Sequence, residues 1–268
     1  MDAEIPGIAA ETLRKQLGCA TSPWLIDVRR QPAYDGDTHT LAGALRFDPD
    51  RVADWSSSLP RDRQLVAVCV HGHQVSQGVA RALRDQGFDA VFLEGGIEHW
   101  KVERGATMRR LANDATASGN SIPVADAART SHWVTRARPK VDRIACPWLI
   151  KRFIDLRAQF HFVPARDVAA EAARLAGFAF DADGARFTHR GERCSFDALI
   201  EDFELNDAPL ARLATIVRGA DTGRLDLAAE APGLLALSQG LSSVFADDHE
   251  QLAAGLTLYD ALYAYCRS

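Results

Sequence analysis

The sequence has no excess of basic residues, which is the usual mark of a protein that binds nucleic acid. Its 31 lysines and arginines stand against 36 aspartates and glutamates, so the formal net charge is −5 at pH 7. The net charge therefore does not indicate a nucleic-acid partner, although it does not exclude a local basic patch that binds one. Any attraction of anions has to be local and has to depend on individual loops.

Cysteine is scarce, and long apolar runs are absent. The chain has five cysteines, an odd number, without a C-x-x-C motif, which indicates reduced thiols and not a disulfide framework. No segment approaches the ~18 apolar residues that span a bilayer, and the N-terminus has no apolar signal core. We therefore expect a cytoplasmic protein with no membrane partner.

The 268 residues are long for one compact core and sufficient for two. The stretch Leu111–Arg129 is rich in small and polar residues and is weakly periodic, as in an exposed linker. We accordingly predict a first domain over residues 1–108, a linker over residues 109–131 and a second domain over residues 132–268.

The first hundred residues alternate between short apolar runs and a helical pattern. Residues 24–28, 65–69 and 89–93 are typical of buried strands, and residues 75–87 follow a helical period that ends at a glycine. A strand, a helix and a strand within so few residues indicate a right-handed parallel unit. The first domain is therefore predicted to be α/β, with a parallel sheet flanked by helices.

The second domain is predicted to be mostly helical with a small β element. Pro147 is expected in the first turn of a helix, Ser195 is expected to cap another, and Asp247 and Asp248 are expected to cap the last one. Asp183 and Gly184 stand between two alternating runs, which predicts a hairpin. The predicted helices cover residues 147–156, 165–176, 196–203, 209–217, 232–245 and 249–265, with a strand over residues 160–163.

Cys69 ends the second predicted strand and precedes a loop that turns at once into a helix. Such a loop directs unpaired backbone N–H groups and the positive end of a helix dipole toward one point, which favours a thiolate over a thiol. The same donors suit a persulfide or an oxyanion. The alternative for Cys69 is a buried core thiol. The expected anion-binding loop consists of Val70, His71, Gly72, His73, Gln74, Val75 and Ser76.

Four ordered motifs in this region resemble the rhodanese family: WLIDVR from Trp24, LAGALRF from Leu41, CVHGHQVS from Cys69 and LEGGIEHW from Leu93. The resemblance implies a sulfurtransferase whose persulfide-carrying nucleophile matches Cys69, with Asp27 and Arg29 supporting the loop. It also implies a sulfur donor and a thiol acceptor as partners. Gln74 stands where many active rhodaneses carry an arginine. His71 and His73 are candidates for the missing positive charge or for proton donors, or else they are exposed loop histidines.

The second domain offers two sets of candidate site residues. Asp142, Arg143 and Cys146 lie close together in the sequence, although an Asp142–Arg143 ion pair and a core-packing Cys146 are open alternatives. The second set contains residue types that bind first-row metals, without the spacing that would place them on one face. The candidate ligands of a divalent metal ion are His189, Glu201, Asp221 and His249. No cofactor is otherwise indicated.

Residues 133–267 resemble the C-terminal domain of the chromate-resistance ChrB family, through VDRIACPWLIKRFID, FTHRGERCSFDALI, IVRGADTG and LYDALYAYC. The resemblance links the domain to chromate tolerance and to sensing or regulation. Two functions follow as hypotheses. The first is a sulfurtransferase that carries sulfane sulfur on Cys69. The alternative is a chromate- or redox-responsive sensor whose rhodanese fold binds an oxyanion or a partner without turnover.

Overall fold

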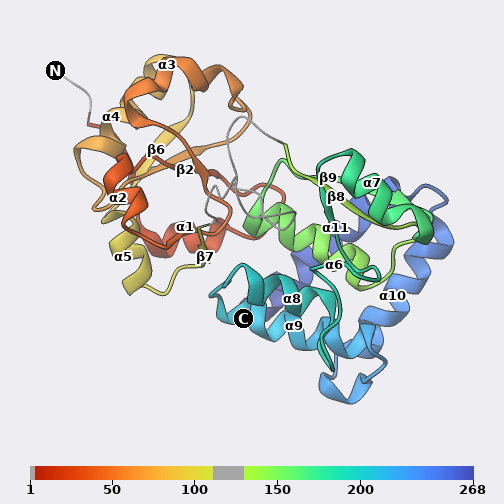
Figure 1. Ribbon diagram of the computed structural model, residues 1–268. Helices are drawn as coiled ribbons and strands as arrows, with labels where there is room; N and C mark the ends of the chain where they lie inside the picture. Colours follow the sequence, from red (N-terminus) through yellow and green to blue (C-terminus); the bar gives the residue numbers. More distant parts are fainter. Residues whose placement is uncertain (1–3, 111–129) are drawn as a thin grey trace. The chain divides into compact units, whose positions relative to one another are not determined.

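The computed structural model describes residues 4–110 and 130–268, so residues 111–129 of the predicted linker lie outside the described residues (Figure 1). The chain divides into two compact units, of which the first comprises Met1–Arg129 with Phe153–Asp155 and the second comprises Thr130–Arg152 with Leu156–Ser268. The first unit is α/β, and the second is mostly helical with a small parallel sheet, so the predicted fold class is confirmed.

The first unit is built on a sheet of five parallel strands in the order β1-β6-β5-β2-β4. Strands β2 and β5 pair in register from Trp24–Leu65 to Asp27–Val68, so both strands end at the same edge. A separate antiparallel pair joins β3 to β7. The strands are β1 (Gly7–Ile8), β2 (Trp24–Asp27), β3 (His39–Leu41), β4 (Leu45–Arg46), β5 (Leu65–Val68), β6 (Ala90–Leu93) and β7 (Thr107–Arg109).

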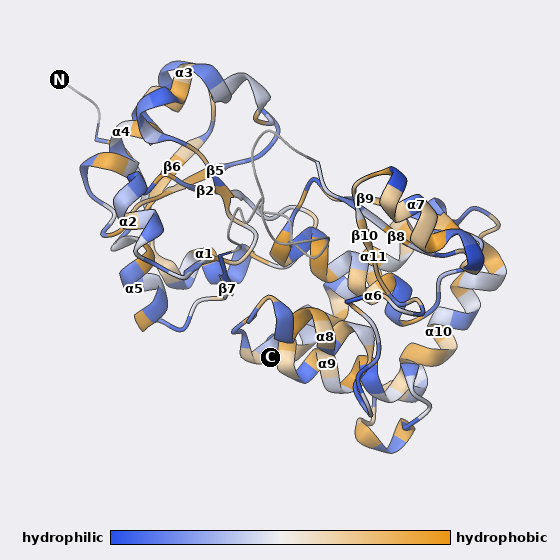
Figure 2. Ribbon diagram, in the orientation of Figure 1, coloured by the Kyte–Doolittle hydropathy of each residue, from blue (hydrophilic) through white to orange (hydrophobic). Residues whose placement is uncertain are grey.

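Helices cover both faces of this sheet. Alternate residues of the central strands, such as Val66 and Val68, form a core cluster with Leu13 of α1 and Ile97 of α5. Helix α4 packs against β5 and β6 without joining that cluster, so it covers the opposite face. Figure 2 shows the central strands as hydrophobic. The helices are α1 (Ala10–Gln16), α2 (Gln31–Asp35), α3 (Val52–Trp55), α4 (Gln74–Asp85) and α5 (Gly96–Val102), with 3-10 turns at Pro49–Arg51 and Ser56–Ser58.

The second unit packs helices around a parallel three-stranded sheet in the order β10-β8-β9. Trp133 of β8 is fully buried among aromatic rings, including Phe178 and Phe187. The elements are β8 (His132–Arg136), α6 (Asp142–Leu149), a π-helical turn (Ile150–Ile154), β9 (Gln159–Val163), a 3-10 turn (Ala165–Asp167), α7 (Val168–Arg174), β10 (Phe178–Ala179), α8 (Ser195–Asp202), α9 (Ala208–Asp221), a 3-10 turn (Leu225–Leu227), α10 (Ala231–Val244) and α11 (Asp248–Arg267).

Across residues 4–110 and 130–268, no helix combines the length and the apolar character that a membrane crossing requires.

The predicted position of Pro147 in a first helical turn is wrong. Helix α6 starts at Asp142, so Pro147 lies inside it, and the helix continues into the π-helical turn. Proline lacks the amide that would bond one turn back, which normally breaks a helix. Here every residue from Ile144 to Leu149 is buried, so tertiary packing outweighs the local cost of the proline.

Two further predictions about this unit are wrong. The expected hairpin around Asp183 and Gly184 does not form, because Phe178 and Ala179 pair in parallel with β8 and the Phe180–Phe187 bridge is also parallel. Ser195 does not cap α8, since it is the first residue of the helix. Cys194 caps the helix instead, and its backbone N–H donates to the Asp197 carboxylate at 3.1 Å.

Candidate functional site

Cys69 follows β5 directly and faces the first turn of α4. Its side chain is buried, with the residue 6% exposed, and its Sγ lies 3.1 Å from the Oγ of Ser76. The Ser76 hydroxyl is also within hydrogen-bond distance of the carbonyl oxygen of His73, in the loop between Cys69 and α4. The thiol therefore has one polar neighbour from the helix that follows its own loop.

The loop after Cys69 carries a continuous row of free backbone donors. In the described part of the chain, no amide N–H from Val70 to Ser76 donates a hydrogen bond to a protein acceptor. Three of these amides belong to the first turn of α4, where a helix leaves its N–H groups unsatisfied. Free amides beside a sulfur atom favour negative charge on it or on an atom bonded to it. The arrangement suits an anionic adduct of Cys69.

Gly72 and Gly96 allow this loop to pack closely against the start of α5. The amide of Ile97 donates to the carbonyl oxygen of Cys69 at 2.9 Å, and the amide of Glu98 donates to Val70 at 3.2 Å. Gly72 has a positive φ of 72°, and a Cβ there would lie 2.4 Å from the carbonyl oxygen of Leu93. The loop shape therefore depends on backbone contacts that leave no room for a side chain.

Replacing Gly96 with alanine is expected to lower the stability of the first unit by about 2 kcal/mol or more, because Gly96 has a left-handed φ of 59°. The new Cβ would also lie 2.4 Å from the carbonyl oxygen of Val70 and 2.5 Å from that of Cys69. Urea unfolding measures the loss. Gly78→Ala on α4 is the matched control, since its Cβ meets nothing within 4 Å, and we expect a gain of about 0.5–1 kcal/mol there. Equal effects of the two changes would contradict this account of the loop.

Asp27 and Arg29 form a buried ion pair at the end of β2. The Nη2 of Arg29 lies 2.6 Å from the Oδ2 of Asp27, and each side chain is 1% exposed. Arg29 also binds Asp37 at 2.7 Å and the carbonyl oxygen of His39 at 3.1 Å. Burial lowers the pKa of Arg29, but its hydrogen bonds and charge interactions with Asp27 and Asp37 outweigh burial and raise it.

This pair lies next to the cysteine loop in the sheet. Asp27 pairs with Val68, the residue before Cys69, and the amide of Val28 donates to the carbonyl oxygen of Val68 at 2.8 Å. The remaining loop candidates, His71, His73 and Gln74, are exposed, and the two imidazole rings lie 6.0 Å apart.

The second unit gathers titratable side chains that the sequence places far apart. The Nε2 of His189 lies 3.0 Å from Asp221, 3.6 Å from Asp142 and 3.7 Å from Asp181. Asp142 begins α6, Asp221 ends α9, and His189 and Asp181 lie in the segment between β10 and α8. Asp142 and Asp221 come from separate predicted sets, whereas Asp181 was not predicted. The only sequence signal for Asp181 is an acidic residue directly after an apolar run.

The carboxylate of Asp142 is completely buried at this cluster. It accepts hydrogen bonds from the amides of Ser195 at 2.6 Å and Phe196 at 3.3 Å, at the start of α8. Burial, and then the charges of Asp221 and Asp181, raise the pKa of Asp142 well above its ordinary value. Burial and the charge of Asp181 also raise the pKa of Asp221, against the effect of His189.

The other candidates of the second unit have different partners. Arg143 pairs with Asp181 at 3.3 Å and not with Asp142. Cys146 is fully buried, and burial raises the pKa of its thiol well above its ordinary value, as in a packing residue. Glu201 forms ion pairs with arginines, including Arg190 at 3.4 Å. The ring of His249 contacts that of Phe162, with 5.4 Å between centroids.

Comparison with known families matches the two parts of the chain separately. A model of the rhodanese-like domain matches residues 9–103, and a model of the ChrB C-terminal domain matches residues 133–266. The chain belongs to both families. Its first unit is a rhodanese-like, sulfurtransferase-family domain, and its second is a ChrB C-terminal domain.

Relatives match one unit each. Protein ChrB of Cupriavidus metallidurans is 39% identical over 137 residues, which cover 51% of this chain and 41% of that protein. The chain thus spans less than half the length of this ChrB relative. Thiosulfate sulfurtransferase GlpE of Pseudomonas syringae is 34% identical over 98 residues, which cover 36% of this chain and 85% of that enzyme. A rhodanese-related structure from Thermoplasma volcanium has 22% identity and a TM-score of 0.34, covering 38% of this chain and 96% of that one.

Proposed function

We propose that the rhodanese-like unit is a sulfurtransferase that carries sulfane sulfur as a persulfide on Cys69. The observation that supports this function most directly is the row of free amides that starts at Val70, the residue after Cys69, and ends at Ser76, whose hydroxyl lies 3.1 Å from the sulfur atom. These donors stabilise the charged terminal sulfur of a persulfide at no cost of reorganisation, because the loop is fixed by its contacts with α5. The GlpE relative acts on thiosulfate by its name, which makes thiosulfate the first donor to test.

The reaction takes place in two transfers. The Cys69 thiolate attacks the outer sulfur of thiosulfate, the sulfur–sulfur bond of thiosulfate breaks, and sulfite leaves with the bonding electron pair. A thiolate acceptor, or cyanide in an assay, then attacks the terminal sulfur of the persulfide and restores the Cys69 thiolate. An ionised Cys69 sulfur can only accept, so the Ser76 hydroxyl, 3.1 Å from the Sγ, then donates its one hydrogen to the sulfur in place of the carbonyl oxygen of His73.

The charge of the loop bears on the choice of donor. Gln74 offers neutral hydrogen-bond donors at the helix start where a rhodanese arginine would offer a charge. The exposed His71 and His73 supply positive charge only when they are protonated. We therefore expect weaker binding of a doubly charged donor such as thiosulfate than of a singly charged persulfide donor.

Intact-mass spectrometry tests the proposal. After incubation with thiosulfate, we expect wild-type protein to gain the mass of one sulfur atom and to lose it on addition of cyanide, with release of thiocyanate. Cys69→Ser should gain nothing. Cys19→Ser removes the half-buried thiol after α1 and should behave as wild type. If neither thiosulfate nor a small persulfide donor adds sulfur to the wild type, the proposed function is wrong.

A second candidate function rests on the ChrB C-terminal domain, which makes up half of the chain. In this alternative the protein reports chromate or its oxidative effects to another macromolecule, and the cysteine loop binds the oxyanion without turnover. Titration calorimetry with chromate, with sulfate as the control anion, tests it. Heat that saturates with chromate and is lost in Cys69→Ser supports the sensor, whereas indifference to chromate rules it out.

A further inference from the structure

The strongest unassigned feature lies in the ChrB C-terminal unit, where an imidazole and carboxylates from separate segments meet. One ligand-type atom each from Asp142, His189 and Asp221 can be chosen so that all three lie within 4.8 Å of one another. Metal–oxygen and metal–nitrogen bonds of about 2.0–2.2 Å put neighbouring ligands of one ion about 3–3.5 Å apart. The separations of His189 from Asp221 and Asp142, 3.0 and 3.6 Å, are close to this spacing.

The charges at this point are unbalanced. In the described part of the chain, no lysine or arginine forms an ion pair with Asp142 or Asp221, whereas Asp181 pairs with Arg136 at 2.8 Å and with Arg143 at 3.3 Å. Asp142 and Asp221 therefore lie beside one imidazole without a direct ion pair to a lysine or arginine, and the charge of Arg143 acts on them only at longer range. Burial raises the pKa of both carboxyl groups, and neighbouring negative charges add to it, from Asp221 and Asp181 at Asp142 and from Asp181 at Asp221.

Neighbouring groups hold these side chains in place. Asp142 is fixed by the two amides at the start of α8, and its own amide donates to the Oδ1 of Asp221 at 3.4 Å. The Ser195 hydroxyl donates to Asp181 at 3.0 Å, which fixes the third carboxylate beside His189. Support of this kind from surrounding hydrogen bonds is typical of metal ligands.

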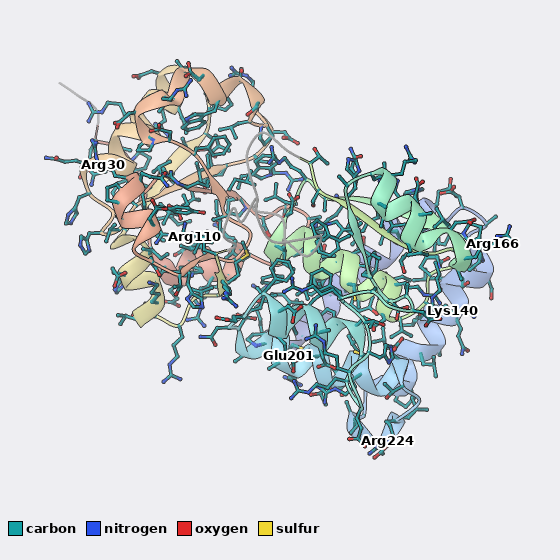
Figure 3. The ribbon with its side chains drawn as sticks, in the orientation of Figure 1. Arg30, Arg110, Lys140, Arg166, Glu201 and Arg224 are labelled. Carbon is teal, nitrogen blue, oxygen red and sulfur yellow. The ribbon has the colours of Figure 1, made fainter. Side chains whose placement is uncertain are left out.

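One side of the cluster opens to a cavity. His189 lines a cavity of about 760 Å³, together with Thr222, Arg190, Arg193, Arg218 and Arg224. The side chain of His189 is 42% exposed, whereas that of Asp142 is 1% exposed. Figure 3 labels Arg224 at the turn beyond α9, which forms part of this cavity. An ion bound at the cluster would thus have protein on one side and an accessible position on the other.

We propose that Asp142, His189 and Asp221 bind one divalent ion of the Mn²⁺, Fe²⁺ or Zn²⁺ class, with its open position toward the arginine-lined cavity. An imidazole with two carboxylates suits these ions, whereas Ca²⁺ requires six to eight oxygen ligands. The buried thiols of Cys146 and Cys194 are not among the ligand-type atoms that lie within 4.8 Å of one another at this cluster.

Binding of Mn²⁺ and Zn²⁺ to the full chain, after treatment with a chelator and its removal, tests this proposal. Titration calorimetry should give one ion per chain, and the electron paramagnetic resonance signal of free Mn²⁺ should fall in the same proportion. The melting temperature should rise with metal. His189→Ala and Asp221→Asn should each weaken binding about 100-fold or more. Both side chains are partly exposed, so we expect the two variants to fold. Circular dichroism checks this.

His249→Ala is the matched control, since His249 contacts Phe162 and lies outside the cluster. It should bind metal as the wild type does. The proposal is overturned if wild-type protein binds neither ion, or if the two cluster variants bind as tightly as the wild type. In the metal-free alternative, His189→Ala lowers the melting temperature and added ions change nothing in any variant. These measurements do not involve Cys69, so they stand apart from the sulfurtransferase proposal.

Discussion

Replacing Arg29 with methionine is expected to destabilise the rhodanese-like unit by about 3–5 kcal/mol. Methionine keeps much of the length of the side chain but leaves the carboxylate of Asp27 buried, at 1% exposure, without its charged partner. The substitution also removes the hydrogen bonds to Asp37 and to the carbonyl oxygen of His39. Because domains typically have 5–15 kcal/mol of stability, a loss of about 3–5 kcal/mol is a large share of it.

Hydrogen exchange read by peptide measures this effect in one unit at a time. Amides of β2 and β5 should lose protection in Arg29→Met, whereas those of α9 and α11 in the other unit should keep it. Lys15→Met is the control, because the Lys15–Glu11 pair is 74% and 73% exposed and should contribute little to stability. Unchanged exchange in β2 and β5 would mean that the buried pair does not hold the strand end in place.

The cysteine loop could be predicted because its parts are contiguous. A buried strand, a loop and an amphipathic helix follow one another from Leu65 to Asp85, and period and composition define each of them. The close contact of this loop with Gly96 has no local signal beyond the glycine pair itself, since it depends on the neighbouring parallel strand. Ser76 is predicted from the sequence only as a member of the anion-binding loop, and the structure adds that its hydroxyl lies 3.1 Å from the Sγ of Cys69.

The carboxylate–imidazole cluster could not be predicted in the same way. Asp142, His189 and Asp221 come from three different elements, and no residue period links them. His249 and Glu201 are of equally suitable residue type, yet the fold puts one against Phe162 and the other against arginines. Residue type selects candidates for a metal site, but only the packing of the helices decides which of them meet.

Pro147 and the missing hairpin have a common cause. In both cases local propensity was outweighed by burial, since α6 is buried along one continuous stretch and the phenylalanines near the turn pack around Trp133. The gain from burying a large side chain, about 1.5–3 kcal/mol each, is as large as the local preferences that favour a break or a turn. Local signals are therefore most reliable in the first unit, where strand and helix periods agree with the sheet topology.

Replacing Cys69 with serine is expected to reduce the rate of sulfur transfer from thiosulfate to cyanide by about 10⁴-fold or more, the scale on which loss of a nucleophile acts. A serine hydroxyl stays protonated near neutral pH and cannot hold sulfur as a persulfide. Because serine differs from cysteine by one atom at a buried site beside Ser76, the loop should keep its shape. Thiocyanate formation under steady-state conditions gives the rate, and an unchanged melting temperature shows that folding is intact.

Ser76→Ala tests the contribution of a neighbouring hydroxyl while the Cys69 nucleophile is kept. It removes the hydroxyl 3.1 Å from the Sγ, and a hydrogen bond to a charged atom contributes about 1.5–3 kcal/mol, so the rate should fall by about 10-fold or more while persulfide still forms. Cys69→Ser should abolish both rate and persulfide, whereas Cys19→Ser should change neither. If turnover persists in Cys69→Ser, another thiol must carry the sulfur, and the cysteine loop has no part in the mechanism.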